Sequence, residues 1–370
     1  MTEPELPLQG LRVVDLTRNV AGPYATMILA DLGAEVLKVE HPDGGDDTRH
    51  WGPPFWGSES PIFLTLNRNK RGLRLDLRHP EAAERLAGEV TSADVLVESF
   101  RAGWLDGLGL GWDWARRLNP RLVYCSLTAF GECGPLRGRP GYDPIVQALV
   151  GIMSVTGEEG RPPVRVGTSI VDMGTGMWAA MAVQAALLQR ERTGQGSRVS
   201  VSLYETGLAW MAYQLANSWA SGQPPGRLGT AMATIAPYEG FRCLDGYLMI
   251  AAPNDGLFLR LSEALGHPEW ADDPRFGSNP ERVANREALH AAMEAVTQGE
   301  TRQAVLDRLL AVGVPGAPVR DLGEVGEDEQ AHALGMFSAL PVEGIPDLRL
   351  VALPMTFDGR RPPIHSGPPS

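Results

Sequence analysis

The amino-acid sequence predicts an α/β fold, with a mainly parallel sheet covered by helices on both faces and a second, smaller α/β domain. Strand-like and helix-like runs alternate over residues 11–127, a pattern typical of parallel sheets. The chain has 370 residues, more than one ordinary domain needs, so two domains are expected. A Gly- and Pro-rich segment at residues 221–226 marks the expected boundary.

The first strand-helix-strand unit is predicted from hydrophobic pattern and from the residues at the helix ends. Residues 11–16 are strand-like, and residues 23–32 form a helix that starts at Pro23 and stops before Gly33. Residues 35–40 give the second strand. Because no G-x-G-x-x-G motif follows the first strand, a dinucleotide-binding site is not expected there.

The remaining elements are predicted by the same signals. In the first two thirds of the chain, helices are expected over 80–91, 112–118, about 174–189 and 204–219, and strands over 93–98, 121–127 and 198–203. Beyond the boundary, strands are expected over 238–243 and 247–252, and helices over about 255–265, 285–296 and 301–312. Parallel sheets bind ligands at the carboxyl ends of their strands, so we expect the site there.

Composition excludes several classes of protein. The formal net charge is −12, whereas nucleic-acid-binding proteins carry a basic excess. The three cysteines form no CxxC pair and the seven histidines lack ligand-like spacing, so neither disulfides nor a metal site is expected. No apolar run reaches about 18 residues and no signal-peptide pattern opens the chain. We therefore expect a soluble, cytoplasmic protein that does not enter a membrane.

A basic segment over residues 67–78 holds five cations within twelve residues. Three further arginines, Arg101, Arg137 and Arg139, fall in Gly- and Pro-rich loops. Arginine and lysine suit the recognition of phosphate, so this set fits a phosphate-bearing small ligand. It equally fits a solvated surface along the edge of a strand, and both interpretations stay open.

Asp172 is the most informative carboxylate, because it stands between a β-type run at 166–171 and the small-residue start of a helix. A side chain at such a corner can reach a pocket. There it can attack an activated acyl group as a nucleophile, or act as a general acid or base. It can also serve only as the N-cap of the helix, since Asp is a favoured N-cap residue.

The sequence resembles the family III CoA-transferases, the CaiB/BaiF type, from about Leu8 to Phe357. The segments that carry the resemblance are LRVVDLT at 11–17, AGP at 21–23, DLGAEVLKVE at 31–40, LNRNKR at 66–71, ESFRAG at 98–103, GYDPIVQA at 141–148, VGTSIVDMGTGM at 166–177, and DG at 245–246 followed by ND at 254–255. Each match is weak alone, but their order and spacing together are specific.

The resemblance implies a large Rossmann-like domain of residues 1–220 with 318–370, a small domain of residues 221–317, and an interlocked homodimer. The nucleophile of the family's transferases matches Asp172. By that analogy Asp172 attacks an acyl-CoA, and CoA reaches a free carboxylic acid through aspartyl anhydride and aspartyl-CoA thioester intermediates. CoA is then a substrate, and no tightly bound cofactor is implied.

The family's contacts to CoA fall on Val20, Ala21, Leu75, Arg78 and Phe100. Three positions depart from the family pattern: His41 replaces an arginine, Ser99 replaces an asparagine, and Gly107 stands where an arginine is common. We expect Arg101, Arg137 and Arg139 to supply the positive charge that these three positions lack.

Two other functions stay open. Racemases of this family need two acid/base groups, and their histidine stands where this chain has Tyr142, a poor base at neutral pH. In a transferase, Tyr142 is expected to hydrogen-bond the acyl or aspartyl intermediate. A non-catalytic acyl-CoA-binding protein is the second alternative, which the intact Asp172 segment disfavours. Glu239 is a further candidate pocket carboxylate, and it fits a surface charge at a strand edge equally well. The backbone amides of residues 173–176 are candidate oxyanion donors, but tight helix packing is the favoured explanation of the glycines there.

Overall fold

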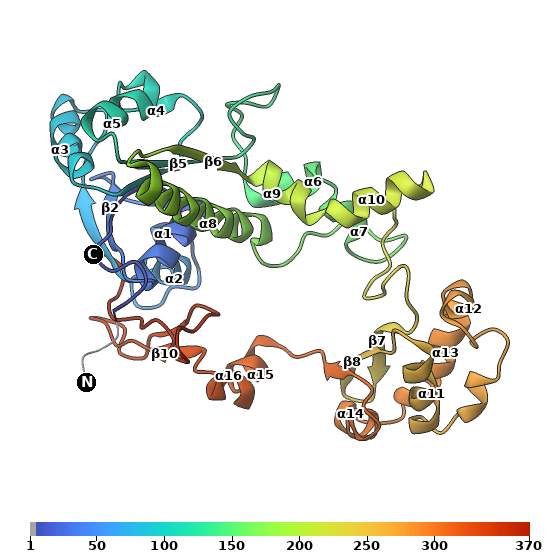
Figure 1. The fold of residues 1–370 in the computed structure, drawn as a ribbon. Helices are drawn as coiled ribbons and strands as arrows, with labels where there is room; N and C mark the ends of the chain where they lie inside the picture. Colours follow the sequence, from blue (N-terminus) through green and yellow to red (C-terminus); the bar gives the residue numbers. More distant parts are fainter. Residues whose placement is uncertain (1–4) are drawn as a thin grey trace. The chain divides into compact units, whose positions relative to one another are not determined.

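The structure, a computed structural model, describes residues 5–370 and divides into two compact units (Figure 1). The larger unit contains the described residues up to 152, residues 165–224 and residues 329–370. The smaller unit contains residues 153–164 and 225–328.

The larger unit is built on a six-stranded parallel sheet with the strand order β3-β2-β1-β4-β5-β6. The strands are β1 (Arg12–Leu16), β2 (Glu35–Glu40), β3 (Lys70–Arg74), β4 (Val95–Glu98), β5 (Val123–Thr128) and β6 (Arg198–Ser202). Val13 of β1 lies opposite both Val36 and Val95, so the strand order reverses between β1 and β4. This is the Rossmann strand order, and the predicted α/β class with a mainly parallel sheet is confirmed.

Helices cover both faces of this sheet (Figure 1). One face is covered by α1 (Ala21–Asp31) and α8 (Ile170–Thr193), which pack against each other. The other face is covered by α3 (Pro80–Thr91) and α5 (Trp112–Leu118), where Val14, Leu96 and Tyr124 of the sheet meet Leu86 of α3. The sheet therefore has apolar contacts on both sides, as its continuous apolar strands require.

Shorter helices complete the larger unit. They are α2 (Pro61–Asn67), α4 (Trp104–Gly107), α6 (Asp143–Leu149), α9 (Leu203–Trp210), α10 (Ala212–Ser221) and α16 (Glu329–Ala333), with a 3-10 turn at Asp47–His50. The helix α7 (Ile152–Val155) falls at the division of the chain, with Ile152 in the larger unit and residues 153–155 in the smaller unit. The single helix predicted over 204–219 is wrong, because the chain breaks at Met211 into α9 and α10. The edge strand β3 and helix α2 were not predicted.

The helix α8 also begins earlier than predicted. It starts at Ile170 rather than near Gly174, so residues 166–171 form no strand and Asp172 lies inside the first turn of the helix. Its N-cap is Ser169, so the interpretation of Asp172 as an N-cap is wrong. Among residues 5–370, α8 has the length and composition of a membrane span, yet half of its apolar window is buried, as in the core helix of a folded protein.

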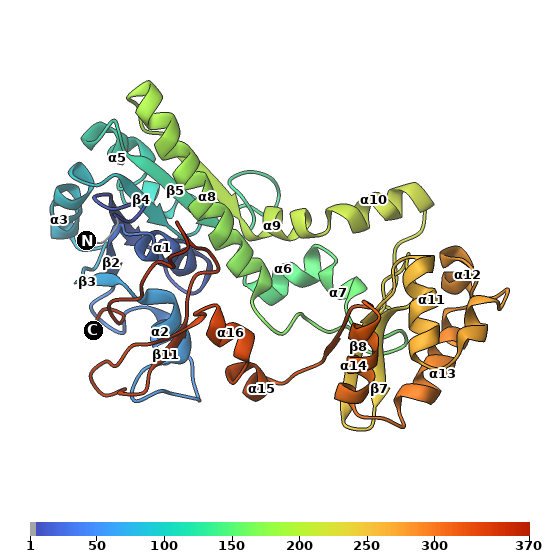
Figure 2. The ribbon, with the colours of Figure 1, turned by 60° about the horizontal axis from the view of Figure 1, so that its bottom comes forward.

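The C-terminal segment returns to the larger unit (Figure 2). Strands β10 (Phe337–Ala339) and β11 (Arg349–Val351) pair antiparallel, and Leu350 packs with Leu64 of α2. The last residues lie beside the start of β3, where the Asn69 N–H donates to the carbonyl oxygen of Ser366 at 3.0 Å. Both ends of the described chain thus belong to one unit.

The smaller unit contains an antiparallel sheet of β7 (Tyr238–Cys243), β8 (Gly246–Ala251) and β9 (Gly316–Pro318). Its helices are α11 (Asp255–Ala264), α12 (Asn279–Ala284), α13 (Arg286–Thr297), α14 (Arg302–Ala311) and α15 (Leu322–Gly326), with a 3-10 turn at Pro268–Ala271. Phe241, Leu248, Phe258 and Leu289 form part of its core. The expectation of a smaller α/β part is confirmed.

Candidate active site

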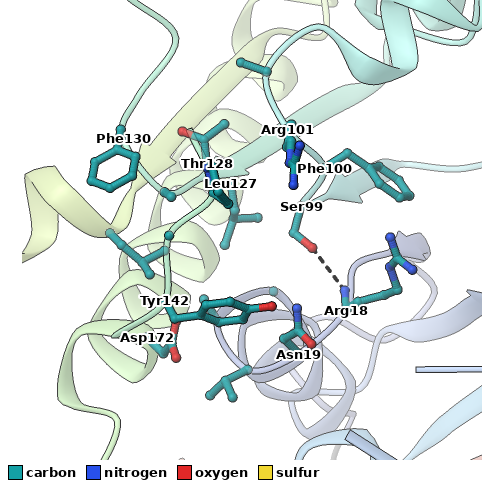
Figure 3. A pocket seen from close by; sticks show the side chains of 18 of the residues that line it. Arg18, Asn19, Ser99, Phe100, Arg101, Leu127, Thr128, Phe130, Tyr142 and Asp172 are labelled. Carbon is teal, nitrogen blue, oxygen red and sulfur yellow. Dashed lines mark hydrogen bonds between the residues drawn. The ribbon is translucent and has the colours of Figure 1, made fainter. Parts of the chain in front are cut away.

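A pocket of about 470 Å³ lies at the carboxyl ends of β1, β4 and β5 in the larger unit (Figure 3). Its lining includes residues 18–22 after β1, 99–102 after β4 and 127–131 at the end of β5. The loop 138–142 and Asp172 complete one side. Because the strand order reverses between β1 and β4, this is the crevice in which open α/β sheets bind ligands.

The carboxylate of Asp172 reaches this pocket because a different residue caps α8. Asp143, in the first turn of α6, accepts hydrogen bonds from the backbone N–H groups of Val171 at 2.8 Å and Asp172 at 3.1 Å. The side-chain amide of Gln147 donates to the other oxygen of Asp143 at 2.5 Å. Asp143 therefore occupies the N–H groups at the start of the helix. The Asp172 side chain is left free for the pocket.

Burial raises the pKa of Asp172 to about 7, and the negative charge of Asp143 adds to the rise. Within residues 5–370, no salt bridge or hydrogen bond to the carboxylate of Asp172 offsets this effect. The acid and the carboxylate forms are then both populated at neutral pH. A poorly solvated carboxylate of raised pKa is a better nucleophile and base than an ordinary one.

Tyr142 extends from the loop before α6 beside Asp172, and its ring points across the pocket toward Asn19 (Figure 3). The side chain is 54% exposed, so Tyr142 is a pocket residue rather than a core aromatic. Its hydroxyl has no protein partner within the described chain. It is positioned to hydrogen-bond a ligand held between Asp172 and Asn19.

Four arginines line the pocket: Arg18, Arg78, Arg101 and Arg139. None of them forms a salt bridge with any carboxylate of residues 5–370. The guanidinium of Arg18 lies 5.4 Å from the centre of the Phe100 ring, which in turn stacks on Trp104 at 4.4 Å. Unpaired guanidinium groups beside stacked rings suit an anionic ligand with several phosphates and an aromatic base.

Other cations of the basic segment do not reach the pocket. Arg68 is buried and binds Asp31 at 2.7 Å, and Lys70 is buried and binds Asp15 at 3.1 Å. Arg71 and Arg74 are exposed on β3 and do not line the pocket. Neither interpretation of this segment holds throughout, because two of its cations are structural and one, Arg78, faces the pocket.

The structure brings together most of the site residues expected from the sequence. Val20, Ala21, Arg78, Phe100, Arg101, Tyr142 and Asp172 all line the pocket. His41 and Leu75 do not: His41 lies 3.6 Å from Asp76, and Leu75 packs into the core beneath α3. Arg137 is likewise absent from the lining residues.

Two functional interpretations are wrong, whereas the alternative of tight helix packing for the glycines is confirmed. Glu239 lies in the smaller unit, where its buried carboxylate is bound by Arg286 at 3.4 Å and His290 at 3.0 Å. The glycines after Asp172 serve helix packing, because a Cβ at Gly176 would lie 2.6 Å from the carbonyl oxygen of Ala21. The Met173 N–H is already bonded to the carbonyl oxygen of Ser169 at 2.9 Å, within the first turn of α8.

Sequence reasoning missed several lining residues, among them Arg18, Asn19, Trp51, Thr128 and Phe130. Arg18 and Asn19 directly follow the first strand, and Thr128 ends the strand β5. The rule that ligands bind at the carboxyl ends of parallel strands points to these positions. Trp51 carries no such signal, because it follows a 3-10 turn outside the strand pattern.

Comparison with known proteins gives one family. Residues 8–370 match the sequence model of CoA-transferase family III. The succinate–glutarate CoA-transferase of Agrobacterium fabrum is 40% identical over 343 residues, covering 91% of this chain and 86% of that protein. The acetyl-CoA:oxalate CoA-transferase of Acetobacter aceti is 40% identical over 335 residues, covering 90% of this chain and 86% of that protein.

Solved structures agree with the sequence comparison. A CaiB/BaiF family protein from Brucella suis has a TM-score of 0.89 at 40% identity, covering 99% of this chain and 97% of that one. The protein Rv3272 from M. tuberculosis has a TM-score of 0.89 at 31% identity, covering 100% of this chain and 98% of that one.

Proposed function

Because the chain belongs to CoA-transferase family III, we propose that it moves CoA from an acyl-CoA to a free carboxylic acid through covalent intermediates on Asp172. The observation that carries this proposal is the free carboxylate of Asp172 in a pocket lined by four unpaired arginines. The arginines suit the phosphates of CoA, and the carboxylate suits attack on its thioester.

The proposed reaction has four steps, each of which exchanges one acyl bond. An oxygen of Asp172 attacks the donor thioester carbon, the C–S bond breaks, and a mixed anhydride and CoA thiolate form. The thiolate attacks the aspartyl carbon, which releases the donor acid and leaves an aspartyl-CoA thioester. The acceptor carboxylate attacks that thioester and displaces the thiolate, which then attacks the acceptor carbon of the second anhydride. The products are the new acyl-CoA and the Asp172 carboxylate.

These four reaction steps need no general base, because every nucleophile in them is already an anion, either a carboxylate or a thiolate. Arg18, Arg78, Arg101 and Arg139 are proposed to hold the phosphates, and Val20 and Ala21 to line the path of the pantetheine arm. Tyr142 is proposed to hydrogen-bond the acyl or aspartyl intermediate. His41 and Leu75 lie outside the lining and are proposed only as contacts of a ligand portion extending from the pocket.

For the substrates, we propose short dicarboxylic acids and their CoA thioesters. The names of several relatives point to this class, since they act on succinate and glutarate, oxalate, or mesaconate. Succinyl-CoA with glutarate is therefore the first donor and acceptor pair to assay.

Peptide mass spectrometry tests the covalent step. The protein is mixed with succinyl-CoA and quenched with hydroxylamine, which converts an aspartyl thioester or anhydride to a hydroxamate. We expect the hydroxamate on the Asp172 peptide of the wild type and none in Asp172→Ala. Asp113→Ala is the matched control, because Asp113 is an exposed aspartate in the first turn of α5. An unmodified Asp172 peptide during active turnover would contradict the mechanism.

A racemase is the alternative that one observation favours, since a pKa of about 7 also suits general acid and base catalysis by Asp172. Racemisation needs a second such group. Within the described lining of this pocket there is no histidine to serve as that group. Deuterium uptake at the α-carbon of a 2-methylacyl-CoA, without CoA transfer to any acid, would establish the racemase instead.

We also propose that the chain forms an interlocked homodimer and works in the cytoplasm. Large apolar side chains are exposed on two helices of the larger unit, with Leu188 of α8 at 69% and Trp219 of α10 at 77%. A second copy would cover such surfaces. The three cysteines are free, which suits a reducing compartment. Light scattering after size-exclusion chromatography tests the dimer, and a monomer at micromolar concentration would contradict it.

A further inference from the structure

The loop between β1 and α1 presents an unusual asparagine to the pocket. Asn19 has a backbone φ of 68°, in the left-handed region that Asn, Asp and Gly adopt most readily. Its side chain lines the pocket between Tyr142 and Arg18 (Figure 3). Its Oδ1 atom is buried and accepts no hydrogen bond from any residue that the structure describes. Such an atom in a folded protein calls for an explanation.

The backbone around Asn19 is firmly held, so the unsatisfied side chain is not the result of a loose loop. Three successive N–H groups are bonded: Thr17 to Asp15 at 2.9 Å, Arg18 to the Ser99 hydroxyl at 3.0 Å, and Asn19 to Asp46 at 3.2 Å. Asp46 is itself fixed by the buried Lys38 at 2.9 Å. The chain therefore fixes this backbone and leaves the amide of Asn19 for another partner.

The position of Asn19 indicates which part of a ligand it meets. Asp172, where the thioester reacts in the proposed function, lies on one side of it, and the guanidinium of Arg18 lies on the other. In CoA, the pantetheine arm spans the distance between the thioester and the phosphates. That arm carries two amide groups and no charge.

A side-chain amide is complementary to another amide. It offers one acceptor and two donors, so it can accept from an N–H and donate to a C=O of the same partner. A small rotation of the terminal torsion of Asn19 presents both groups, since that torsion is broad and weakly restricted. A phosphate offers no donor to an unpaired Oδ1, and a carboxylate offers none either.

We propose that Asn19 binds an amide of the pantetheine arm and thereby sets the distance from the phosphate-binding arginines to Asp172. The proposal rests on the proposed function, because it takes CoA as the ligand. It makes Asn19 a specificity-determining residue that separates CoA thioesters from nucleotides sharing the same phosphates.

Calorimetric titration of two ligands tests this assignment. CoA contains the arm, and adenosine 3′,5′-bisphosphate carries the adenosine and its phosphates without the arm. Asn19→Gly keeps the left-handed backbone and removes the amide without adding a charge. We expect this variant to bind CoA about tenfold more weakly, as loss of one or two hydrogen bonds implies. Its affinity for the bisphosphate is expected to match the wild type.

The outcomes separate the two proposals. Equal weakening of both ligands, or no weakening of either, would overturn the role of Asn19 while leaving the transferase proposal intact. A wild-type protein that binds neither ligand would remove the proposed function and this inference with it. A melting temperature equal to that of the wild type shows that the Gly variant is folded.

Discussion

Two aspartates of the larger unit, Asp15 and Asp172, show what a partner cation does to a buried carboxylate. Burial alone would raise the pKa of Asp15, but the ammonium groups of Lys70 and Lys38 and two threonine hydroxyls outweigh it and hold that pKa below its ordinary value. Asp172 has no such partner among residues 5–370, and burial together with Asp143 raises its pKa to about 7. Burial disfavours the charged form of a carboxylate, and neighbouring cations and hydrogen-bond donors decide whether its pKa ends above or below the ordinary value.

The difference separates framework from function. Asp15 holds Thr17 and Lys70 beneath the first pocket loop, so its charge is used to fix the backbone. The Asp172 carboxylate binds no other group of the described chain, so its charge is available to a substrate. An uncompensated charge in an active site lowers stability, and such sites are where natural proteins accept that cost.

Removal of the Asp172 carboxylate is expected to have the largest effect on activity. Asp172→Ala should lower kcat for succinyl-CoA:glutarate transfer by about 10⁴-fold or more, because the nucleophile is lost. CoA binding should be retained and the variant should stay folded, since no hydrogen bond or salt bridge of the described residues involves the Asp172 carboxylate and its buried charge does not stabilise the fold. Steady-state assay and CoA titration measure both. A variant with a tenth of wild-type kcat would end the claim that Asp172 is the nucleophile.

Removal of the Asp15 charge is expected to lower the stability of the fold, whereas removal of the Asp172 carboxylate lowers activity. Asp15→Asn leaves Lys70 buried without its closest carboxylate, which costs about 3–5 kcal/mol of folding free energy. Urea unfolding monitored by fluorescence measures this loss. Asp113→Ala, on the surface of α5, serves as the control and should change stability by less than about 0.5 kcal/mol. A stable Asp15→Asn variant with unchanged unfolding would refute the framework role.

The elements of the fold that depend on local signals could be predicted from the sequence. Strands β1, β2, β4 and β5 are runs of apolar and β-branched residues, and α1 has Pro23 near its start and Gly33 past its end. These cues act within a few residues, so they are visible in one dimension. Asp172 was singled out by its place between an expected β-type run and a helix start, and its role as nucleophile was inferred from the resemblance to the family's transferases.

The rest depended on contacts between distant segments. The cap of α8 comes from Asp143, nearly thirty residues before Asp172, so the sequence wrongly offered Asp172 as the N-cap. Arg68 and Lys70 were interpreted as phosphate-binding or surface cations because their partners, Asp31 and Asp15, lie on other elements. The strand β3 was missed because its sequence, KRGLR, is charged and contains glycine.

A smaller effect is expected on the pH dependence of folding stability. The pKa of Asp172 is raised from an unfolded value near 3.8 to about 7, so the folded state binds more protons between these values and loses stability as the pH rises through them. Asp172→Asn removes that titration. It should be more stable than the wild type by about 1–3 kcal/mol at pH 8, and no more stable at pH 4. Urea unfolding at both values measures this difference.

The same ionisation should govern catalysis, because only the carboxylate attacks a thioester. We expect kcat/KM to rise about tenfold from pH 6 to pH 8 around an apparent pKa near 7. A flat profile over this range, together with equal stability of Asp172→Asn at pH 8, would show that the Asp172 carboxylate is compensated like that of Asp15.

The smallest expected effect concerns the arginines, where a side chain that lines the pocket is compared with one that does not. Arg78 lines the pocket without a salt bridge, whereas Arg71, on the same segment, is exposed outside the pocket. Arg78→Ala should weaken CoA binding about tenfold at low salt, by the loss of one charge-assisted hydrogen bond, and leave stability unchanged. Arg71→Ala should alter neither. Because salt screens exposed charges, the difference between the two variants should shrink as ionic strength rises. Equal CoA affinity of both variants at low salt would place the phosphates elsewhere in the pocket.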